Sequence, residues 1–154
     1  MEYITATSDM VDAVHDILHT AIKTIYPKYY PKEVAEFFCR HHSKEHILDG
    51  ITSGNMGVLV VDNVIAGTGC FDNNHITGVY VLPSHQKQGC GTQIMNCLEN
   101  EIRKKHDTAI LDASLPAVCL YEHRGYKTVG HGIYELENDV KLVYEIMEKK
   151  LRVG

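Results

Sequence analysis

Residues 79–91 read Val-Tyr-Val-Leu-Pro-Ser-His-Gln-Lys-Gln-Gly-Cys-Gly, and they change character twice. An apolar run ends at Pro83, a polar turn follows, and the two glycines open a segment whose apolar residues recur at helical steps, with polar residues such as Glu99 between them. The first N–H groups of a helix lack intrahelical partners and lie at the positive end of its dipole. Because glycines at 89 and 91 carry no Cβ to block a phosphate, this strand, turn and helix predict a site for a phosphate-bearing ligand.

Two common phosphate-binding loops fit this segment less well. A P-loop needs Gly-Lys-Ser/Thr after its second glycine, whereas Gly91 is followed by Thr92 and Gln93. A dinucleotide fold needs a third glycine close to the start of a βαβ unit, but more than seventy residues precede this turn. Gly-x-Gly alone also begins helices that bind nothing. The longer pattern Val-x-Pro-x-x-Gln-x-x-Gly-x-Gly, which starts at Val81, is more specific.

A second pattern follows after one predicted helix. Residues 109–114 predict a strand, and Pro116 suits the first turn of a helix. Residues 117–126 then read Ala-Val-Cys-Leu-Tyr-Glu-His-Arg-Gly-Tyr. The first pattern resembles motif A of the GNAT superfamily of N-acetyltransferases, and the second resembles that family's Ala-x-x-Leu/Phe-Tyr-x-x-x-Gly-Phe/Tyr signature. The resemblance is clear from about residue 56 to the end of the chain.

The remaining patterns predict an α/β (α+β) fold in one domain, residues 1–154. Helices are expected at about 10–25, 31–41 and 43–51, and strands at 3–6, 56–61, 64–71 and 75–82. After the helix that follows the glycines, we expect a strand at 109–114, a short helix, and strands at 126–129 and 140–148. This order is that of the GNAT fold, a mixed, mostly antiparallel sheet of six to seven strands flanked by four to five helices.

Composition narrows the class of protein. The 44% apolar and 23% charged residues are ordinary for a globular domain, and the net charge of −5 argues against binding nucleic acid or anionic membranes. Five cysteines without a C-x-x-C pair indicate neither a disulfide framework nor a zinc site, so a reducing, cytoplasmic compartment is expected. We see no secretory signal and no apolar run of the ~20 residues needed to cross a membrane.

The resemblance implies acetyl-CoA as the co-substrate, with its diphosphate against the backbone amides of the turn. Its pantetheine arm would pair like an extra strand, and the amide near Val79 would face the thioester oxygen. Ser114 stands where many relatives place asparagine, which keeps a hydrogen-bonding group there. Lys87 adds a charge contact or is simply an exposed lysine. The residues implied in cofactor binding are Val79, Tyr80, Val81, Gln86, Lys87, Gln88, Gly89, Cys90, Gly91, Thr92, Ser114 and Tyr121.

The same resemblance implies catalytic roles. Tyr121 aligns with the tyrosine that protonates the departing thiolate, which suits a phenol with a pKa of ~10, although a packing role is the alternative. His75 stands where some family members carry a glutamate base, and a histidine with a pKa near 6.5 suits that task. An exposed histidine at the start of a strand is also unremarkable. Asp72 and Glu45 are further candidates, and some amines need no base.

The resemblance also implies an acceptor site built by the first two helices and the last hairpin. Tyr26, Tyr29 and Tyr30 either surround an amine or pack on the sheet. His41, His42 and His46 lie close together in sequence, but adjacent histidines on a helix point in different directions, so no metal is expected.

The predicted function is direct transfer of the acetyl group of acetyl-CoA to a primary amine through a ternary complex. The alternatives are a non-catalytic coenzyme A-binding or sensory module and, more remotely, a nucleotide-binding regulator. Polyamines, amino acids, aminoglycosides and protein amines all stay open as acceptors. Family members are often dimers, and by that analogy a homodimer is one alternative, with the oligomeric state left open.

Overall fold

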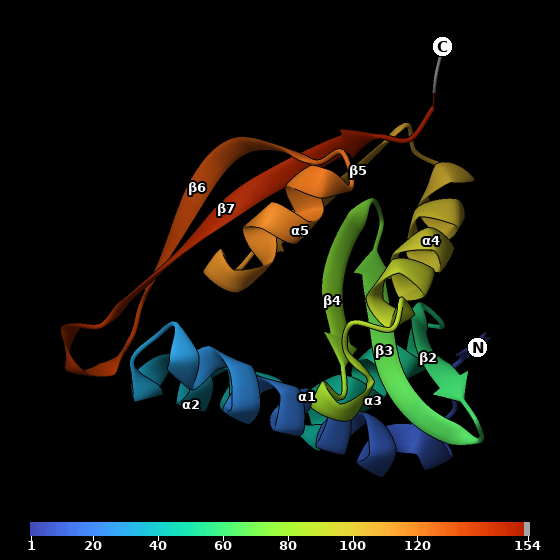
Figure 1. Cartoon of the computed structure of the whole chain (residues 1–154), viewed down its shortest axis with the longest axis horizontal. Helices are drawn as coiled ribbons and strands as arrows, with labels where there is room; N and C mark the ends of the chain where they lie inside the picture. The colour runs from blue at the N-terminus through green and yellow to red at the C-terminus, as the bar shows by residue number, and fades with distance from the viewer. Residues whose placement is uncertain (153–154) are drawn as a thin grey trace.

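The computed structural model describes residues 1–152 and forms a seven-stranded sheet in the order β1-β2-β3-β4-β5-β7-β6 (Figure 1). Only the contact between β4 and β5 is parallel, and the other five contacts are antiparallel. The strands are β1 (Glu2–Thr5), β2 (Met56–Val61), β3 (Val64–Asp72), β4 (His75–Val81), β5 (Thr108–Ala113), β6 (Lys127–Glu135) and β7 (Lys141–Lys150).

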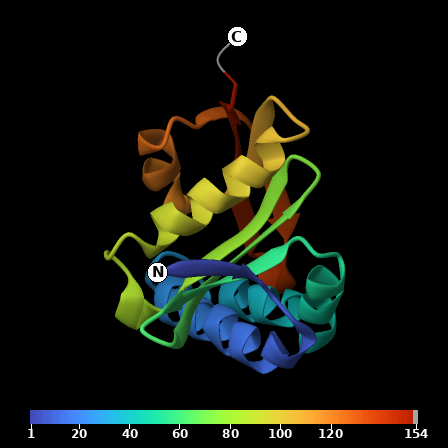
Figure 2. The same cartoon turned by 90° about the vertical axis from the view of Figure 1, so that its right-hand side faces the viewer.

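Helices cover both faces of the sheet, as Figures 1 and 2 show from two sides. The first three helices in the chain lie on one face, and the last two lie on the other. They are α1 (Val11–Ile25), α2 (Lys32–His41), α3 (Lys44–Thr52), α4 (Cys90–Arg103) and α5 (Val118–His123). None of the helices within residues 1–152 is both long and apolar enough to span a bilayer. The fold class predicted from the sequence is confirmed.

Two helices present the apolar stripes that their sequences predict. On α1 the stripe from Val14 to Ile22 is buried, and on α4 Cys90, Ile94 and Leu98 are buried against the sheet. Burying each large apolar side chain contributes about 1.5–3 kcal/mol relative to exposing it, so these stripes hold both helices to their faces. The start of α4 is thereby fixed beside the end of β4.

The sequence underestimates β6, whose predicted range was 126–129. The strand runs from Lys127 to Glu135 and pairs with β7 along its length. Gly130 and Gly132 interrupt the strand pattern in the sequence, because glycine has low intrinsic β propensity. Pairing of the two glycines with Ile146 and Tyr144 of β7, which are 16 and 12 positions away, holds this segment in the sheet despite its low local propensity.

The sheet opens between β4 and β5. These strands pair only at His75–Ile110 and Ile76–Leu111, while the rest of β4 pairs with β3 alone. A bulge accompanies the opening, because Cys70 lies opposite Gly78 and Phe71 lies opposite Ile76, which leaves Thr77 without an opposite residue. One edge of β4 is therefore unpaired in the middle of the sheet.

Candidate active site

The turn between β4 and α4 presents free backbone donors. Lys87 and Gly89 have positive φ angles of 61° and 84°, and α4 begins at Cys90. Within residues 1–152, the backbone N–H groups of residues 87–92 find no backbone acceptor. A Cβ added at Gly89 or Gly91 would meet nothing within 4 Å. Donors, open space and the positive end of a helix dipole together fit a diphosphate such as that of acetyl-CoA.

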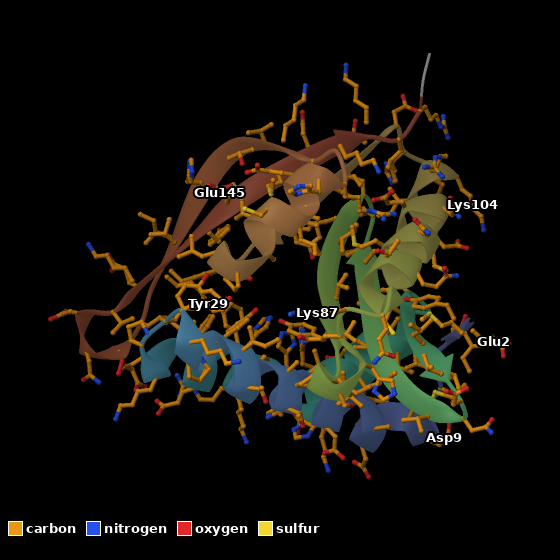
Figure 3. All side chains as sticks on the ribbon, viewed as in Figure 1. Glu2, Asp9, Tyr29, Lys87, Lys104 and Glu145 are labelled. Carbon is orange, nitrogen blue, oxygen red and sulfur yellow. The ribbon has the colours of Figure 1, made fainter. Side chains whose placement is uncertain are left out.

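The glutamine side chains hold this turn from within. Gln86 Nε2 donates to the carbonyl oxygen of Val81 at 3.2 Å, and Gln88 Nε2 donates to that of Ser84 at 3.3 Å. Lys87, labelled in Figure 3, is exposed. The side chain of Gln86 is thus occupied inside the protein, and the main chain carries the unused donors.

A cavity of about 310 Å³ lies where β4 and β5 diverge. It brings together six residues that the sequence singles out from distant parts of the chain, Tyr26, His75, Val79, Tyr80, Ser114 and Tyr121. Further lining residues are Phe38, His41, His42, Ile76, Thr77, Gly78, Leu111, Asp112, Ala117, Tyr134, Leu142 and Tyr144.

Tyr121 reaches the cavity from α5. Its neighbour Leu120 is 66% exposed, so the side chain of only one of the two turns inward. The Tyr121 ring packs edge-on against Tyr126 with 5.8 Å between ring centres. Burial is the main cause that raises the pKa of Tyr121 to about 12, with nearby Tyr26 acting in the same direction and Arg124 opposing it. The hydroxyl is therefore protonated at neutral pH and able to donate a proton.

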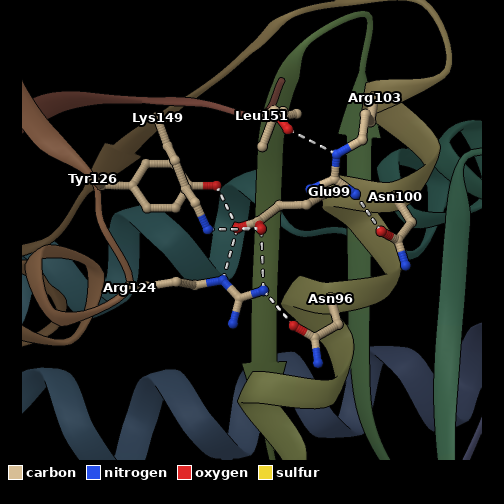
Figure 4. A network of polar contacts seen from close by, with 8 residues as sticks. All are labelled: Asn96, Glu99, Asn100, Arg103, Arg124, Tyr126, Lys149 and Leu151. Carbon is tan, nitrogen blue, oxygen red and sulfur yellow. Dashed lines mark hydrogen bonds and ion pairs between the residues drawn. The ribbon is translucent and has the colours of Figure 1, made fainter. Parts of the chain in front are cut away.

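A buried carboxylate connects α5 to α4 and β7 (Figure 4). Glu99 on α4 accepts hydrogen bonds from Arg124 at 2.7 Å, Lys149 at 3.0 Å and Tyr126 at 2.9 Å. Burial by itself would raise the pKa of Glu99, but these hydrogen bonds outweigh it and lower the pKa. Because α4 begins at the phosphate-binding turn and α5 carries Tyr121, the network holds the two ends of the candidate site in a fixed relation.

His75 has a carboxylate neighbour that the sequence reading missed. His75 Nε2 lies 3.7 Å from Asp112 Oδ2, and the two side chains are 41% and 39% exposed. The residues lie at the one place where β4 and β5 still pair. Residues alternate between the two faces of a strand, so Asp112 lies on the face opposite buried Leu111. This alternation is the local sequence signal for the position of Asp112.

The three candidate tyrosines occupy different environments. Tyr26 is buried and lines the cavity, and burial raises its pKa. The hydroxyl of Tyr30 accepts a hydrogen bond from the N–H of Leu115 at 2.6 Å, which ties the loop after α1 to the turn before α5. Tyr29 (labelled in Figure 3) is 57% exposed and does not line the cavity.

Histidines gather where α2 ends and α3 begins. The ring of His41 lies 4.7 Å from that of His46 and 5.1 Å from that of His42. His42 is buried, and its Nε2 lies 3.3 Å from the hydroxyl of Tyr80. Burial, together with the neighbouring His41 and His46, lowers the pKa of His42 to about 3. No group of three or more metal-ligating side chains in the described part of the chain is placed to hold a metal ion.

Comparison with solved structures supports the fold. A GCN5-related N-acetyltransferase from Rhodopseudomonas palustris superposes with a TM-score of 0.89 at 18% identity, covering 97% of this chain and 94% of that one. PaiA N-acetyltransferase from Thermoplasma acidophilum, solved in complex with coenzyme A, gives 0.77 at 18% identity over 97% and 98% of the two chains. YncA from Salmonella typhimurium, solved with acetyl-CoA, gives 0.76 at 16% identity over 100% and 95%.

Sequence comparison identifies the family. No curated protein sequence matches the chain. The family model described as "Acetyltransferase (GNAT) domain" matches residues 25–143, which is well over half of the chain. The chain therefore belongs to the GNAT acetyltransferases, a family of acyltransferases.

Proposed function

We propose that the protein transfers the acetyl group of acetyl-CoA directly to a primary amine while both substrates are bound. The observation that carries this proposal is that three features of the candidate site lie close together. The free amides of residues 87–92 lie in the turn that leads from β4 into α4, and the unpaired edge of β4 and the hydroxyl-bearing ring of Tyr121 border one cavity. Relatives of the same fold were solved with coenzyme A and acetyl-CoA, which supports the choice of co-substrate.

Acetyl-CoA supplies an acetyl group that is already activated as a thioester. The backbone amides of residues 87–92 bind its diphosphate, and the edge of β4 at Val79, Tyr80 and Val81 receives its pantetheine arm as an added strand. Ser114 offers a hydroxyl at the same cavity. The N–H of Val79 donates to the thioester oxygen, and one such donor contributes ~3 kcal/mol to catalysis.

Two side chains move protons. His75 accepts a proton from the incoming amine, and Tyr121 gives its proton to the leaving sulfur as the C–N bond forms and the C–S bond breaks. A raised phenol pKa keeps Tyr121 protonated until the thiolate develops. His75 and Tyr121 both line the cavity, so each has access to its reacting atom.

Replacing Tyr121 with phenylalanine tests the acid. Tyr121→Phe should lower kcat by ~10²-fold, in line with the usual contribution of acid catalysis, while coenzyme A binding stays within about twofold. The readout is thiol release in the presence of an amine panel, together with calorimetry of coenzyme A binding. Tyr3→Phe is the matched control, because Tyr3 is a half-buried tyrosine on β1 whose hydroxyl donates to Gly69 instead. Unchanged turnover in Tyr121→Phe would remove Tyr121 from this role.

The same measurements separate transfer from binding. Coenzyme A binding without thiol release from acetyl-CoA, with every amine, would indicate a non-catalytic coenzyme A-binding module. Absence of coenzyme A binding would contradict both readings.

A further inference from the structure

The described lining of the first cavity contains an acidic side chain but neither lysine nor arginine. Within residues 1–152, Asp112 is the only carboxylate among its lining residues. A second cavity of about 410 Å³ shares Tyr80 and His42 with the first. It adds Asp49 and Asp72, and again its lining contains no lysine or arginine in the described part of the chain. An acceptor that carries a carboxylate or phosphate would find no lysine or arginine as counter-ion in either cavity. The basic side chains in the described lining are histidines, and burial lowers the pKa of two of them, His41 and His42, which favours their neutral form.

Aromatic rings form the walls of the first cavity. Tyr134 on β6 and Tyr144 on β7 stack with 5.2 Å between ring centres. Tyr26 and Phe38 meet edge-on at 5.1 Å from the side of α1 and α2. Such rings favour an apolar or aromatic group between them, and their faces also attract a cation.

Gly132 sets the position of one wall. It pairs with Tyr144 across the β6–β7 ladder, and the ring of Tyr144 lies over it so closely that a Cβ at Gly132 would overlap the ring. A Cβ at Gly130, two residues earlier on the same strand, would meet only the Ile146 side chain at 3.7 Å. The position of the Tyr144 ring therefore depends on glycine at 132 and not on glycine at 130.

From the aromatic walls of the cavity and from Asp112 we propose that the acceptor is a small primary amine with an aromatic or branched apolar group, and without a carboxylate or phosphate. The proposal rests on the acetyl transfer proposed above. The ammonium group lies by Asp112 and His75, and the apolar group lies between the Tyr134–Tyr144 and Tyr26–Phe38 ring pairs. The cavity volume of about 310 Å³ falls in the range of small-molecule sites. The ammonium group first loses one proton to solvent. The neutral amine nitrogen then forms the bond to the acetyl carbon as the C–S bond breaks, its second proton passes to His75, and the leaving sulfur takes a proton from Tyr121.

A matched set of amines tests the charge argument. Phenylalanine and phenylalaninamide differ chiefly in charge, and 2-phenylethylamine lacks the extra group. We expect 2-phenylethylamine and phenylalaninamide to bind within about tenfold of each other, and phenylalanine to bind ~10²-fold more weakly, measured by calorimetry with coenzyme A present and by kcat/KM for thiol release. Equal use of phenylalanine and its amide would overturn the proposal. Tighter binding of spermidine than of 2-phenylethylamine would overturn it as well.

Two glycine substitutions test the wall. Gly132→Ala should raise the Kd and KM for 2-phenylethylamine about tenfold and leave the Kd for coenzyme A unchanged, because the displaced Tyr144 ring enters the acceptor side. Gly130→Ala should leave both values unchanged. Equal amine affinity in the two variants would remove Tyr144 from the acceptor site.

A charge variant covers the case in which Gly132→Ala does not fold. Asp112→Asn should weaken binding of 2-phenylethylamine about tenfold without changing coenzyme A binding, whereas Asp16→Asn, an exposed position on α1, should change neither. An unchanged amine Kd in Asp112→Asn would contradict the proposal.

The outcomes separate the two proposals. Absence of thiol release with every amine contradicts acetyl transfer, whereas calorimetry of the amines still decides the acceptor class. Thiol release that is fastest with phenylalanine contradicts only the acceptor class.

Discussion

At the scale of single residues, Glu99 is unusual because it is a carboxylate in a buried position. Carboxylates are rarely buried without partners, and Glu99, at 3% exposure, has three donors around one carboxylate. Two of the donors are cationic and come from α5 and β7. The residue therefore joins three elements and leaves no charge without a partner.

Removing this charge should cost far more than removing an exposed one on the same helix. Glu99→Gln leaves Arg124 and Lys149 without their counter-ion, which should lower the free energy of unfolding by about 3–5 kcal/mol. Glu101→Gln, which breaks only an exposed pair with Lys104, should cost about 0–1 kcal/mol. Urea denaturation of the two variants measures both values. A similar loss in both would contradict the role given to the buried network.

At the scale of elements, the turn before α4 and the free edge of β4 lie in sequence along one stretch of chain. The turn takes positive φ at Lys87 and Gly89, and α4 then begins with its N–H groups directed away from protein acceptors. Gly91 lies in the first turn of that helix with open space beside it. No neighbouring atom occupies the space where a Cβ of residue 91 would lie, so the packing of α4 does not require glycine at this position.

A methyl group at Gly91 should separate folding from cofactor binding. Gly91→Ala has room in the protein and improves helix propensity by ~0.5–1 kcal/mol, so thermal stability should hold or rise. Coenzyme A should bind about tenfold more weakly, because the methyl group lies where a diphosphate approaches the amides. Calorimetry gives the Kd, and Gly130→Ala is the control with an equally small added group. An unchanged Kd in Gly91→Ala would place the diphosphate elsewhere.

At the scale of the whole molecule, the sheet consists of two parts joined by a short parallel contact. Strands β1–β4 form one part and β5, β7 and β6 the other, and they meet only at His75–Ile110 and Ile76–Leu111 (Figure 1). Beyond that contact, buried His42 packs against half-buried Tyr80 on β4. Protonating His42 would therefore place a charge in a buried position, which destabilises the folded protein.

Stability should fall in mild acid because of His42. Its folded pKa of about 3 is below the ordinary 6.5, so between those values the unfolded chain binds the proton more strongly. The free energy of unfolding should be constant above pH ~6.5 and fall below it by up to about 1.4 kcal/mol per pH unit from this residue. Urea denaturation from pH 5 to 8 measures the slope.

Two substitutions identify the source of that slope. His42→Asn should reduce it, whereas His131→Asn, a histidine with a side chain 60% exposed on β6, should leave it nearly unchanged. Equal slopes in the wild type and His42→Asn would assign acid sensitivity to other groups.

The sequence by itself determined what depends on neighbours along the chain. The turn ahead of Cys90, the start of α4 and the apolar stripe of α1 follow from spacing, propensity and glycine position, which are local properties. The family patterns also lie in continuous stretches. The resemblance in these stretches implies that Val79 and Tyr121 act at the same site. Both residues line one cavity, and their roles stay predictions.

Tertiary structure decided what depends on residues far apart. Glu99 is a charged residue on α4 next to polar Asn100, and its burial follows from Arg124 and Lys149, which are 25 and 50 positions away. The full length of β6 follows from pairing with β7, and the meeting of His75 with Asp112 follows from the parallel contact of β4 with β5. Local propensity sets each segment's conformation, but only packing sets which charges and rings face each other, and the proposed acceptor class is argued from those.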